Sequence, residues 1–177
     1  RTILQLIRSR RRPRLAITDV AHTPFRTLLT DIDVLGHMNN GVYFSIMDLG
    51  RMDLMIRSGA WAKLREHGMY PVMVNETISF RKSLNLGQKF VLETRLVGLD
   101  VKAIYTEQRF VVDGEIYAKA MTRARFLKKS GGTVTVAELG EVVGADVTDM
   151  APPAWVESWA KDVALPATRD TAPSDWD

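Results

Sequence analysis

The feature that most constrains the fold is a long segment, residues 42–56, that is apolar on nearly every side. Only four polar residues interrupt it: Ser45, Asp48, Arg51 and Asp53. A helix that is apolar almost all round is a buried helix. Asp48 with Arg51, and Asp53 with Arg57, have the spacing of ion pairs within one helix. Gly50 lowers helix propensity by about 1 kcal/mol, so its presence predicts a close neighbour at that point.

From residue 72 onward the pattern changes to alternation of apolar and polar residues, which is typical of β-strands with one buried face. The alternating runs are residues 72–81, 89–96, 101–112 and 115–128. Asp113 and Gly114 lie between the last two runs and form the dipeptide preferred in a type I′ hairpin turn. The runs predict an antiparallel meander of four long strands. Residues 25–33 alternate more loosely and predict an earlier strand, and Pro24 suits the beginning of an edge strand.

The last alternating run carries small side chains on one face: Ala118, Ala120, Thr122 and Ala124. Small side chains let a bulky element approach the sheet, and the long apolar helix is the candidate. The expected fold class is therefore α+β, with a curved antiparallel sheet wrapped around one long central helix. Glu76 departs from the pattern, because it lies on the apolar face of its run. It is either an inward carboxylate with a function or the site of a bulge that turns it outward, and the sequence leaves both open.

The chain of 177 residues is long enough for one domain with a sizeable core. We expect three parts: a basic N-terminal arm in residues 1–20, the sheet-and-helix domain in residues 21–130, and a C-terminal appendage in residues 131–177. The appendage is expected to hold a helix over residues 136–143 and a second short amphipathic helix with two tryptophans. Its final stretch is expected to be loose or packed on a partner subunit.

Five arginines crowd seven positions of the N-terminal arm: Arg8, Arg10, Arg11, Arg12 and Arg14. A local arginine run without a fold signal is not a nucleic-acid module, so we interpret it as a solvated tail or a weak anion-binding arm. Weak membrane contact through the arm is compatible with its charge. The apolar patch of residues 3–7 is far too short to span a bilayer. The chain starts at an arginine, which leaves room for a removed targeting segment; we expect a cytoplasmic protein.

Several reaction classes are excluded by what the sequence lacks. There is no cysteine, so disulfides and thiolate chemistry are absent. His22, His37 and His67 have no metal-ligand spacing, and neither a Gly-x-Ser-x-Gly elbow nor a phosphate-binding glycine loop occurs. We therefore expect no metal and no cofactor.

The residues that carry chemistry lie just before the long helix, where residues 31–40 read Asp-Ile-Asp-Val-Leu-Gly-His-Met-Asn-Asn. The first N–H groups of a helix have no partner inside it, and that end is partially positive, so a carbonyl or an anion binds there favourably. Asn39 or Asn40 is a good N-cap. A carboxylate at Asp33 facing these amides would supply a nucleophile or base and an oxyanion site, as acyl transfer requires. The alternative is that these residues only form Asx-turns and a cap.

A resemblance favours the functional alternative. Asp31-x-Asp33-x-x-Gly36-His37-x-Asn39-Asn40-x-x-Tyr43, followed by Asp48-x-x-Arg51, resembles the hot-dog-fold acyl-CoA thioesterases of the 4-hydroxybenzoyl-CoA thioesterase type. The resemblance covers about residues 25–127, and the turn is similar to that of a His-x-Asn-Asn subgroup. It implies that Asp33 acts as nucleophile or general base and that a backbone N–H of Asn40 or Gly41 binds the thioester carbonyl.

The resemblance also implies further roles. His37 either orients Asp33 or a water molecule, or is a structural residue that bonds to a backbone carbonyl. We assign substrate binding to Asn39, Tyr43, Arg81 and Lys82. The last two belong to a pool of basic residues expected to hold the phosphates of CoA: Arg81, Lys82, Arg123, Arg125, Lys128 and Lys129.

The expected activity is hydrolysis of an acyl-CoA, an aroyl-CoA or an acyl carrier protein thioester. Two alternatives stay open: a hot-dog hydratase or dehydratase, and a non-catalytic acyl-binding protein. Hydratases of that fold resemble an Asp-x-Asn-Pro-x-His pattern, which residues 31–40 do not contain. Because sheet edges are normally paired or protected, we expect a homodimer or a dimer of dimers.

Overall fold

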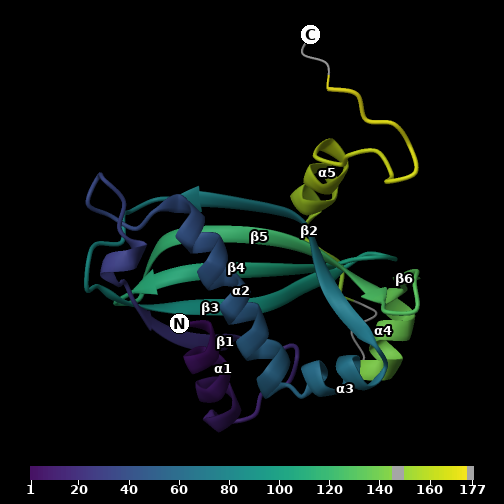
Figure 1. Cartoon of the computed structure of the whole chain (residues 1–177), viewed down its shortest axis with the longest axis horizontal. Coiled ribbons are helices and arrows are strands. Elements are labelled where there is room, and N and C mark those ends of the chain that lie inside the picture. Colours follow the sequence, from purple (N-terminus) through teal and green to yellow (C-terminus); the bar gives the residue numbers. More distant parts are fainter. Residues whose placement is uncertain (145–149, 175–177) are drawn as a thin grey trace.

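The computed structural model describes residues 1–144 and 150–174. At its centre α2 (Asn40–Arg57) runs across the concave face of a six-stranded antiparallel sheet (Figure 1). The strands are β1 (Ala21–Arg26), β2 (Met69–Phe80), β3 (Lys89–Leu99), β4 (Ile104–Val112), β5 (Glu115–Lys128) and β6 (Thr133–Val134). The other helical elements are α1 (Thr2–Arg11), the 3-10 turn η1 (Leu29–Asp31), α3 (Ala60–Glu66), α4 (Val136–Val143) and α5 (Ala154–Asp162). The predicted α+β class, with a curved antiparallel sheet around a long helix, is confirmed.

The strand order is β1-β3-β4-β5-β2, and β6 pairs with β5. β3, β4 and β5 form the predicted meander, and Asp113 and Gly114 have the positive φ angles, 49° and 82°, of the predicted hairpin turn. The four-strand meander is wrong for β2, which pairs with β5 instead of β3. The connection of residues 81–88 explains the difference. It passes against the start of α2, where the Met38 N–H donates to the Leu84 carbonyl at 2.8 Å, before the chain enters β3.

The first strand lies earlier than residues 25–33. β1 pairs with β3 at one edge of the sheet, where Pro24 costs no ladder hydrogen bond. Its end is followed by η1, because the Asp31 carboxylate accepts a hydrogen bond from the Leu28 N–H at 2.7 Å. Such a local side-chain bond favours a turn over a strand, and this outweighs the loose alternation of the sequence.

The main core lies between α2 and the inner face of the sheet and includes Tyr43, Ile46, Met47, Leu92 and Phe110. The predicted close neighbour of Gly50 is present: a Cβ there would lie 2.4 Å from Leu92 Cδ2 and 2.7 Å from Thr94 Oγ1. At this point the helix therefore lies directly against β3. The small residues of β5 divide between two surroundings, since Ala118 and Ala120 join this core and Ala124 lines a cavity.

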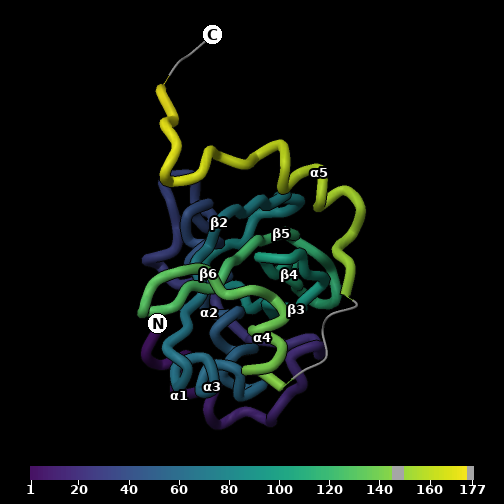
Figure 2. Tube along the Cα trace, turned by 90° about the vertical axis from the view of Figure 1, so that its right-hand side faces the viewer, coloured from purple at the N-terminus to yellow at the C-terminus, as the bar shows by residue number. Residues whose placement is uncertain are grey.

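The predicted helices of the C-terminal appendage are confirmed as α4 and α5. Val156 and Ala160 of α5 pack on Tyr105 and Met121 of the outer face of the sheet. The sheet therefore lies between α5 and α2 (Figure 2). In the part of the chain that the structure describes, no helix combines the length and hydrophobicity needed to cross a bilayer. The division of the chain at residues 20 and 130 stays a prediction.

The arginine-rich start is not a solvated tail. α1 packs along α2, and Arg12, just after α1, places Nη1 2.8 Å from Oδ1 of Asp53, whose side chain is fully buried. Asp53 also accepts hydrogen bonds from the Thr23 hydroxyl at 2.9 Å and from Arg57 at 3.2 Å. The last contact confirms the ion pair predicted within the helix. One buried carboxylate thus joins the end of α1, β1 and the last turns of α2.

Arg12→Ala should lower the free energy of unfolding by about 2 kcal/mol, because it removes one of two cations that face a buried carboxylate. Urea denaturation followed by circular dichroism measures the change. Arg11→Ala is the matched control, since Arg11 is exposed and adjacent in sequence; its effect should stay within about 0.5 kcal/mol. Equal effects of the two substitutions would contradict the assignment.

Candidate active site

The loop that leads into α2 folds back on itself. Ile32 and Met38 form an isolated antiparallel bridge, and the Asp33 N–H donates to the His37 carbonyl at 3.0 Å. Gly36 closes the loop with a φ of 83°, which few other residues tolerate. The side chains of Asp33 and His37 are neighbours, as one of the two alternatives for His37 requires, since His37 Nδ1 lies 3.9 Å from Asp33 Oδ1. Their contact is attractive when His37 is protonated.

Asp33 and Asp31 differ in how their carboxylates are used. Asp33 is half-buried, and its Oδ1 accepts the Leu35 N–H at 2.8 Å, as an Asx-turn residue does. Its Oδ2 has no hydrogen bond within residues 1–144 and 150–174. Asp31 is buried and uses both oxygens: Oδ1 pairs with Arg1 at 2.9 Å, and Oδ2 accepts the Leu28 N–H. Asp33 therefore has an oxygen available for chemistry, whereas Asp31 serves the local fold.

At the start of α2, one of the two predicted amides, that of Gly41, already donates a hydrogen bond within the protein. Asn39 is the N-cap, and its Oδ1 accepts the Gly41 N–H at 2.8 Å. The Asn40 N–H donates to no acceptor among the described residues. Of the two predicted carbonyl-binding amides, Asn40 is therefore the better placed, because Gly41 would first have to release Asn39.

The remaining predicted substrate-binding residues lie apart from this loop or within the core. Tyr43 is 2% exposed, and its ring packs edge-on against Phe80 and Phe110. Burial raises the pKa of its hydroxyl, against the opposing effect of a hydrogen bond to the Leu84 backbone. Arg81 and Lys82 are exposed and share one carboxylate, that of Glu115, at 2.7 and 2.5 Å. Tyr43 is thus placed as a packing residue, and the positive charge at residues 81–82 is half neutralised.

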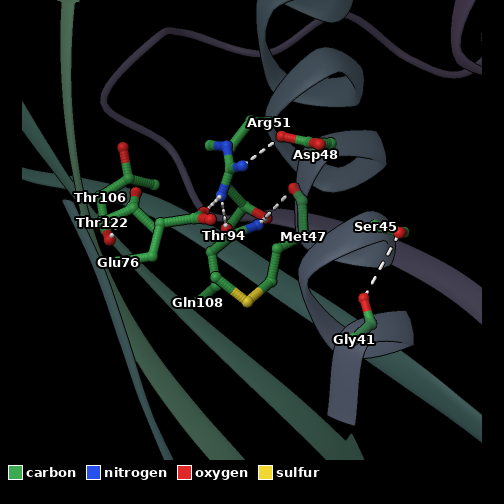
Figure 3. Close-up of polar contacts among 10 residues, drawn as sticks. All are labelled: Gly41, Ser45, Met47, Asp48, Arg51, Glu76, Thr94, Thr106, Gln108 and Thr122. Carbon is green, nitrogen blue, oxygen red and sulfur yellow. Dashed lines mark hydrogen bonds and ion pairs between the residues drawn. The ribbon is translucent and has the colours of Figure 1, made fainter. Parts of the chain in front are cut away.

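A second polar cluster, which sequence reasoning did not assemble, surrounds Arg51 in the middle of α2 (Figure 3). The Arg51 guanidinium pairs with Asp48 one turn earlier and donates to Gln108 Oε1 at 2.8 Å. Gln108 is fully buried and donates to Thr94 Oγ1 and to the Met47 carbonyl, both at 3.0 Å. A buried amide with all its partners in place fixes the helix on the sheet at this point.

Of the two alternatives for Glu76, an inward carboxylate or a bulge that turns it outward, the structure shows the first. A bulge does occur in β2, between Met73 and Asn75, but it comes before Glu76 and turns Val74 outward. Glu76 then pairs with Thr122 on the inner face, with Oε1 3.0 Å from Arg51 Nη1. The contact with Arg51 is an ion pair, and Oε1 accepts no other hydrogen bond among the described residues. Burial raises the pKa of Glu76, and the nearby Arg51 only partly offsets it.

A cavity of about 310 Å³ opens between the later turns of α2 and the inner face of the sheet. Aliphatic, methionine and aromatic side chains form most of its wall, among them Met52, Met55, Met73, Leu96 and Phe126. Its few polar groups are Asp48, Arg51, Thr94 and Thr106. Neither Asp33, His37 nor Asn40 lines it. The predicted reacting groups and the cavity therefore lie at different positions along α2.

A sequence signal for this cluster does exist. Polar residues occupy inward positions of otherwise apolar strands: Glu76, Thr94, Thr106, Gln108 and Thr122. Each would be costly to bury without a partner, so their occurrence in successive strands indicates a shared polar site. The register of the strands was needed to show that they meet.

Glu76 should make stability depend on pH. Its pKa is raised in the folded protein above the ordinary value of 4.5, so it contributes stability below about pH 4.5 that is lost as pH rises through the folded pKa. The free energy of unfolding of the wild type, minus that of Glu76→Gln, should therefore fall as pH is raised from about 4 to about 7.

Glu115→Gln is the matched control for this measurement. Hydrogen bonds from Lys82 and Arg81 lower the pKa of Glu115, so its contribution is present above the ordinary pKa and is lost as pH falls. The free energy of unfolding of the wild type, minus that of Glu115→Gln, should therefore rise with pH. Slopes of the same sign for the two variants would contradict the account of Glu76.

Comparison with known proteins agrees with the geometry. A family model described as the thioesterase-like superfamily matches residues 27–160. Protein THEM6 of Xenopus laevis is 39% identical over 95 residues, which are 54% of this chain and 46% of that protein. The chain spans about half the length of the curated relatives it matches.

Two solved structures share the fold. YbaW probable thioesterase of Escherichia coli aligns with a TM-score of 0.66 at 22% identity, covering 72% of this chain and 98% of that one. The DHNA-CoA thioesterase of Staphylococcus aureus aligns with a TM-score of 0.63 at 13% identity, covering 83% and 97%. The predicted hot-dog fold and family resemblance are confirmed, and the His-x-Asn-Asn subgroup stays a prediction. Because the family match spans more than half of the sequence, this chain belongs to the thioesterase-like superfamily.

Proposed function

We propose that this protein hydrolyses acyl thioesters at the loop before α2. Asp33 removes a proton from a water molecule whose oxygen attacks the thioester carbon, or its carboxylate attacks that carbon itself and forms a mixed anhydride that water then hydrolyses. The carbonyl oxygen gains negative charge and is stabilised by the Asn40 N–H and the positive end of the helix. The carbon–sulfur bond then breaks, and the thiolate takes up a proton, either the one that Asp33 removed from water or one from solvent.

One observation carries the proposal: the Asp33–His37 loop is fastened to the start of α2, whose Asn40 N–H has no acceptor among the described residues. The Asn39 N–H donates to the Asp31 carbonyl at 2.8 Å, and the bridge between Ile32 and Met38 closes the loop. A carboxylate and an oxyanion donor on one short, hydrogen-bonded segment are the parts that acyl transfer requires. The family assignment supports the same reaction.

The cavity supports an aliphatic acyl group as the substrate portion. Its volume of about 310 Å³ lies at the lower end of the range of ligand pockets, and its wall is mostly apolar. Each methylene of an acyl chain that moves from water into this cavity stabilises binding by about 0.8 kcal/mol. CoA or an acyl carrier protein would supply the thiol, and Arg81 and Lys82 are proposed ligands of its phosphate groups.

A homodimer would bring the two parts of the site together. β2 lies at an edge of the sheet and exposes Tyr70, Val74 and Phe80. Antiparallel pairing of β2 with a second copy creates a two-fold axis, and the two α2 helices then run in opposite directions. The start of one helix is thereby directed toward the later turns of the other, where the cavity opens.

Multi-angle light scattering at micromolar concentration should give at least twice the mass of one chain. Val74→Lys places a charge on the exposed edge of β2 and should shift the protein toward the monomer. Val101→Lys is the control, because Val101 is exposed outside the strands and its substitution should leave the mass unchanged. A strict monomer that hydrolysed acyl-CoA at full rate would contradict the dimer.

Asp33→Asn should lower kcat by a factor on the order of 10² or more, because it removes the basic oxygen pair and keeps the shape of the side chain. Release of free CoA from a series of acyl-CoA esters of increasing chain length measures the effect and locates the preferred acyl group. Circular dichroism and the unfolding midpoint serve as controls for folding.

Asp31→Asn is the comparison variant for Asp33→Asn. Asp31 holds Arg1 and the Leu28 N–H, so its substitution should lower stability while reducing kcat less than Asp33→Asn. A folded Asp33→Asn protein with near-wild-type kcat would refute the assignment. The reacting carboxylate would then be sought at Asp48 or Glu76.

A non-catalytic acyl-binding protein is the second candidate. The hydrogen bond from the Leu35 N–H to Asp33 Oδ1 favours it, since it is the bond expected of a residue that only shapes the turn. Binding of acyl-CoA without release of thiol, in the wild type, would distinguish this candidate from a thioesterase.

A further inference from the structure

α1 presents the opposite of the usual amphipathic arrangement. Its polar residues Gln5 and Ser9 face the body of the protein and are 3% and 1% exposed. Three of its four apolar residues, Ile3, Leu4 and Ile7, face outward and are 76%, 52% and 44% exposed, whereas the fourth, Leu6, is half-buried. These three side chains are called here the outer face of α1. Apolar residues on the free side of a surface helix indicate a partner surface.

Positive charge surrounds this outer face. Residues 1–18 contain six arginines and no acidic residue. Arg1 and Arg12 form ion pairs within the protein, with Asp31 and Asp53 respectively. The other four are exposed and have no carboxylate partner among the described residues: Arg8, Arg10, Arg11 and Arg14. A surface that joins aliphatic side chains with unpaired arginines complements an anionic lipid surface in both charge and hydrophobicity.

We propose that α1 docks on the surface of an anionic membrane, with Ile3, Leu4 and Ile7 inserted at the headgroup level. The four exposed arginines then lie among the lipid phosphates, whose charge and geometry suit guanidinium groups. The interaction is interfacial, because a helix of ten residues lies on a bilayer and does not cross it. This proposal is independent of the thioesterase reaction.

The attachment of α1 to the body makes the docking oriented. Arg1 bonds to Asp31 at the first turn, and Arg12 bonds to the buried Asp53 beyond the last turn, so both ends of α1 are held. The helix lies at the margin of the molecule beside α2, remote from α5 (Figure 1). The pair of Arg1 with Asp31 also places the first turn next to η1, where Leu29 is 75% exposed. Lipid contact through α1 would therefore bring η1 and the Asp33 loop close to the membrane.

A second copy of the chain is a less suitable occupant of the outer face. In a two-fold interface the same patch meets itself, and the four arginines of each copy would then face one another. Like charges brought together without carboxylates disfavour that contact, whereas lipid phosphates neutralise them.

Vesicle co-sedimentation tests the proposal directly. The full chain is mixed with vesicles of phosphatidylcholine alone or of phosphatidylcholine with about one third phosphatidylserine, at low and at physiological salt. The protein should sediment with the anionic vesicles and less with the neutral ones. Added salt should weaken the binding, because it screens the arginines.

Two variants separate the charged from the apolar contribution. Arg8→Gln, Arg10→Gln and Arg11→Gln together should weaken binding about a hundredfold, given the usual effect of each basic residue at an anionic surface. Ile3→Ser, Leu4→Ser and Ile7→Ser together should weaken it on the order of tenfold or more, through lost insertion. None of the six side chains packs in the core, so the unfolding midpoint should stay close to that of the wild type.

Matched controls carry the same changes elsewhere. Arg65→Gln, Lys102→Gln and Lys161→Gln remove three exposed charges, and Val101→Ser with Leu165→Ser removes exposed apolar side chains. Both controls should sediment like the wild type. Equal losses in controls and variants would mean that net charge alone attracts the protein, and this would overturn the proposal.

Two other outcomes would also overturn it. If the arginine variant lost binding and the serine variant did not, and if single-stranded RNA competed with the vesicles, α1 would be a polyanion site and not a membrane site. If the serine variant changed the mass measured by light scattering, the outer face would be an interface between copies.

Discussion

The structure depends on the burial of α2 in the concave face of the sheet. Gly50 removes the one side chain that would hold helix and sheet apart over Leu92 and Thr94. Next to it, Arg51 and the fully buried Gln108 join the two layers through hydrogen bonds. Close contact and a satisfied polar group at the same point set both the distance and the rotation of the helix. The features proposed to be functional lie on this helix or next to it.

Three functional features follow from its position. Its start carries the Asn40 amide and follows the loop that holds Asp33, its middle carries the Arg51 cluster, and its later turns form one wall of the apolar cavity. Two elements outside the motif pack around it. α1 packs against α2, and α4 forms part of the cavity wall. The family match, which extends to residue 160, also includes α4 and most of α5. The segments before and after the motif are therefore part of how the site is enclosed.

Local signals in the sequence were enough to predict α2, the hairpin at Asp113, the two C-terminal helices and the motif from Asp31 to Tyr43. Each depends on neighbouring residues: helical or alternating periodicity, a dipeptide with a preferred turn, a cap. The ion pairs of Asp48 with Arg51 and of Asp53 with Arg57 belong to the same class, since a helix brings residues three and four apart together. The expected roles of Asp33, His37 and Asn39 came from the motif, and the loop places these residues close together.

The sequence by itself determined the fold class, the buried helix and the position of the candidate reacting carboxylate, because periodicity and motif spacing are local properties of the chain. Only the tertiary structure decided the place of β2, the inward direction of Glu76, the use of Arg12 by a buried Asp53, and the cavity. Each of these depends on contacts between residues far apart in sequence. A bulge of one residue reverses which face a side chain takes, and a buried carboxylate recruits whichever cation folding brings to it, so neither outcome could be read from neighbouring residues.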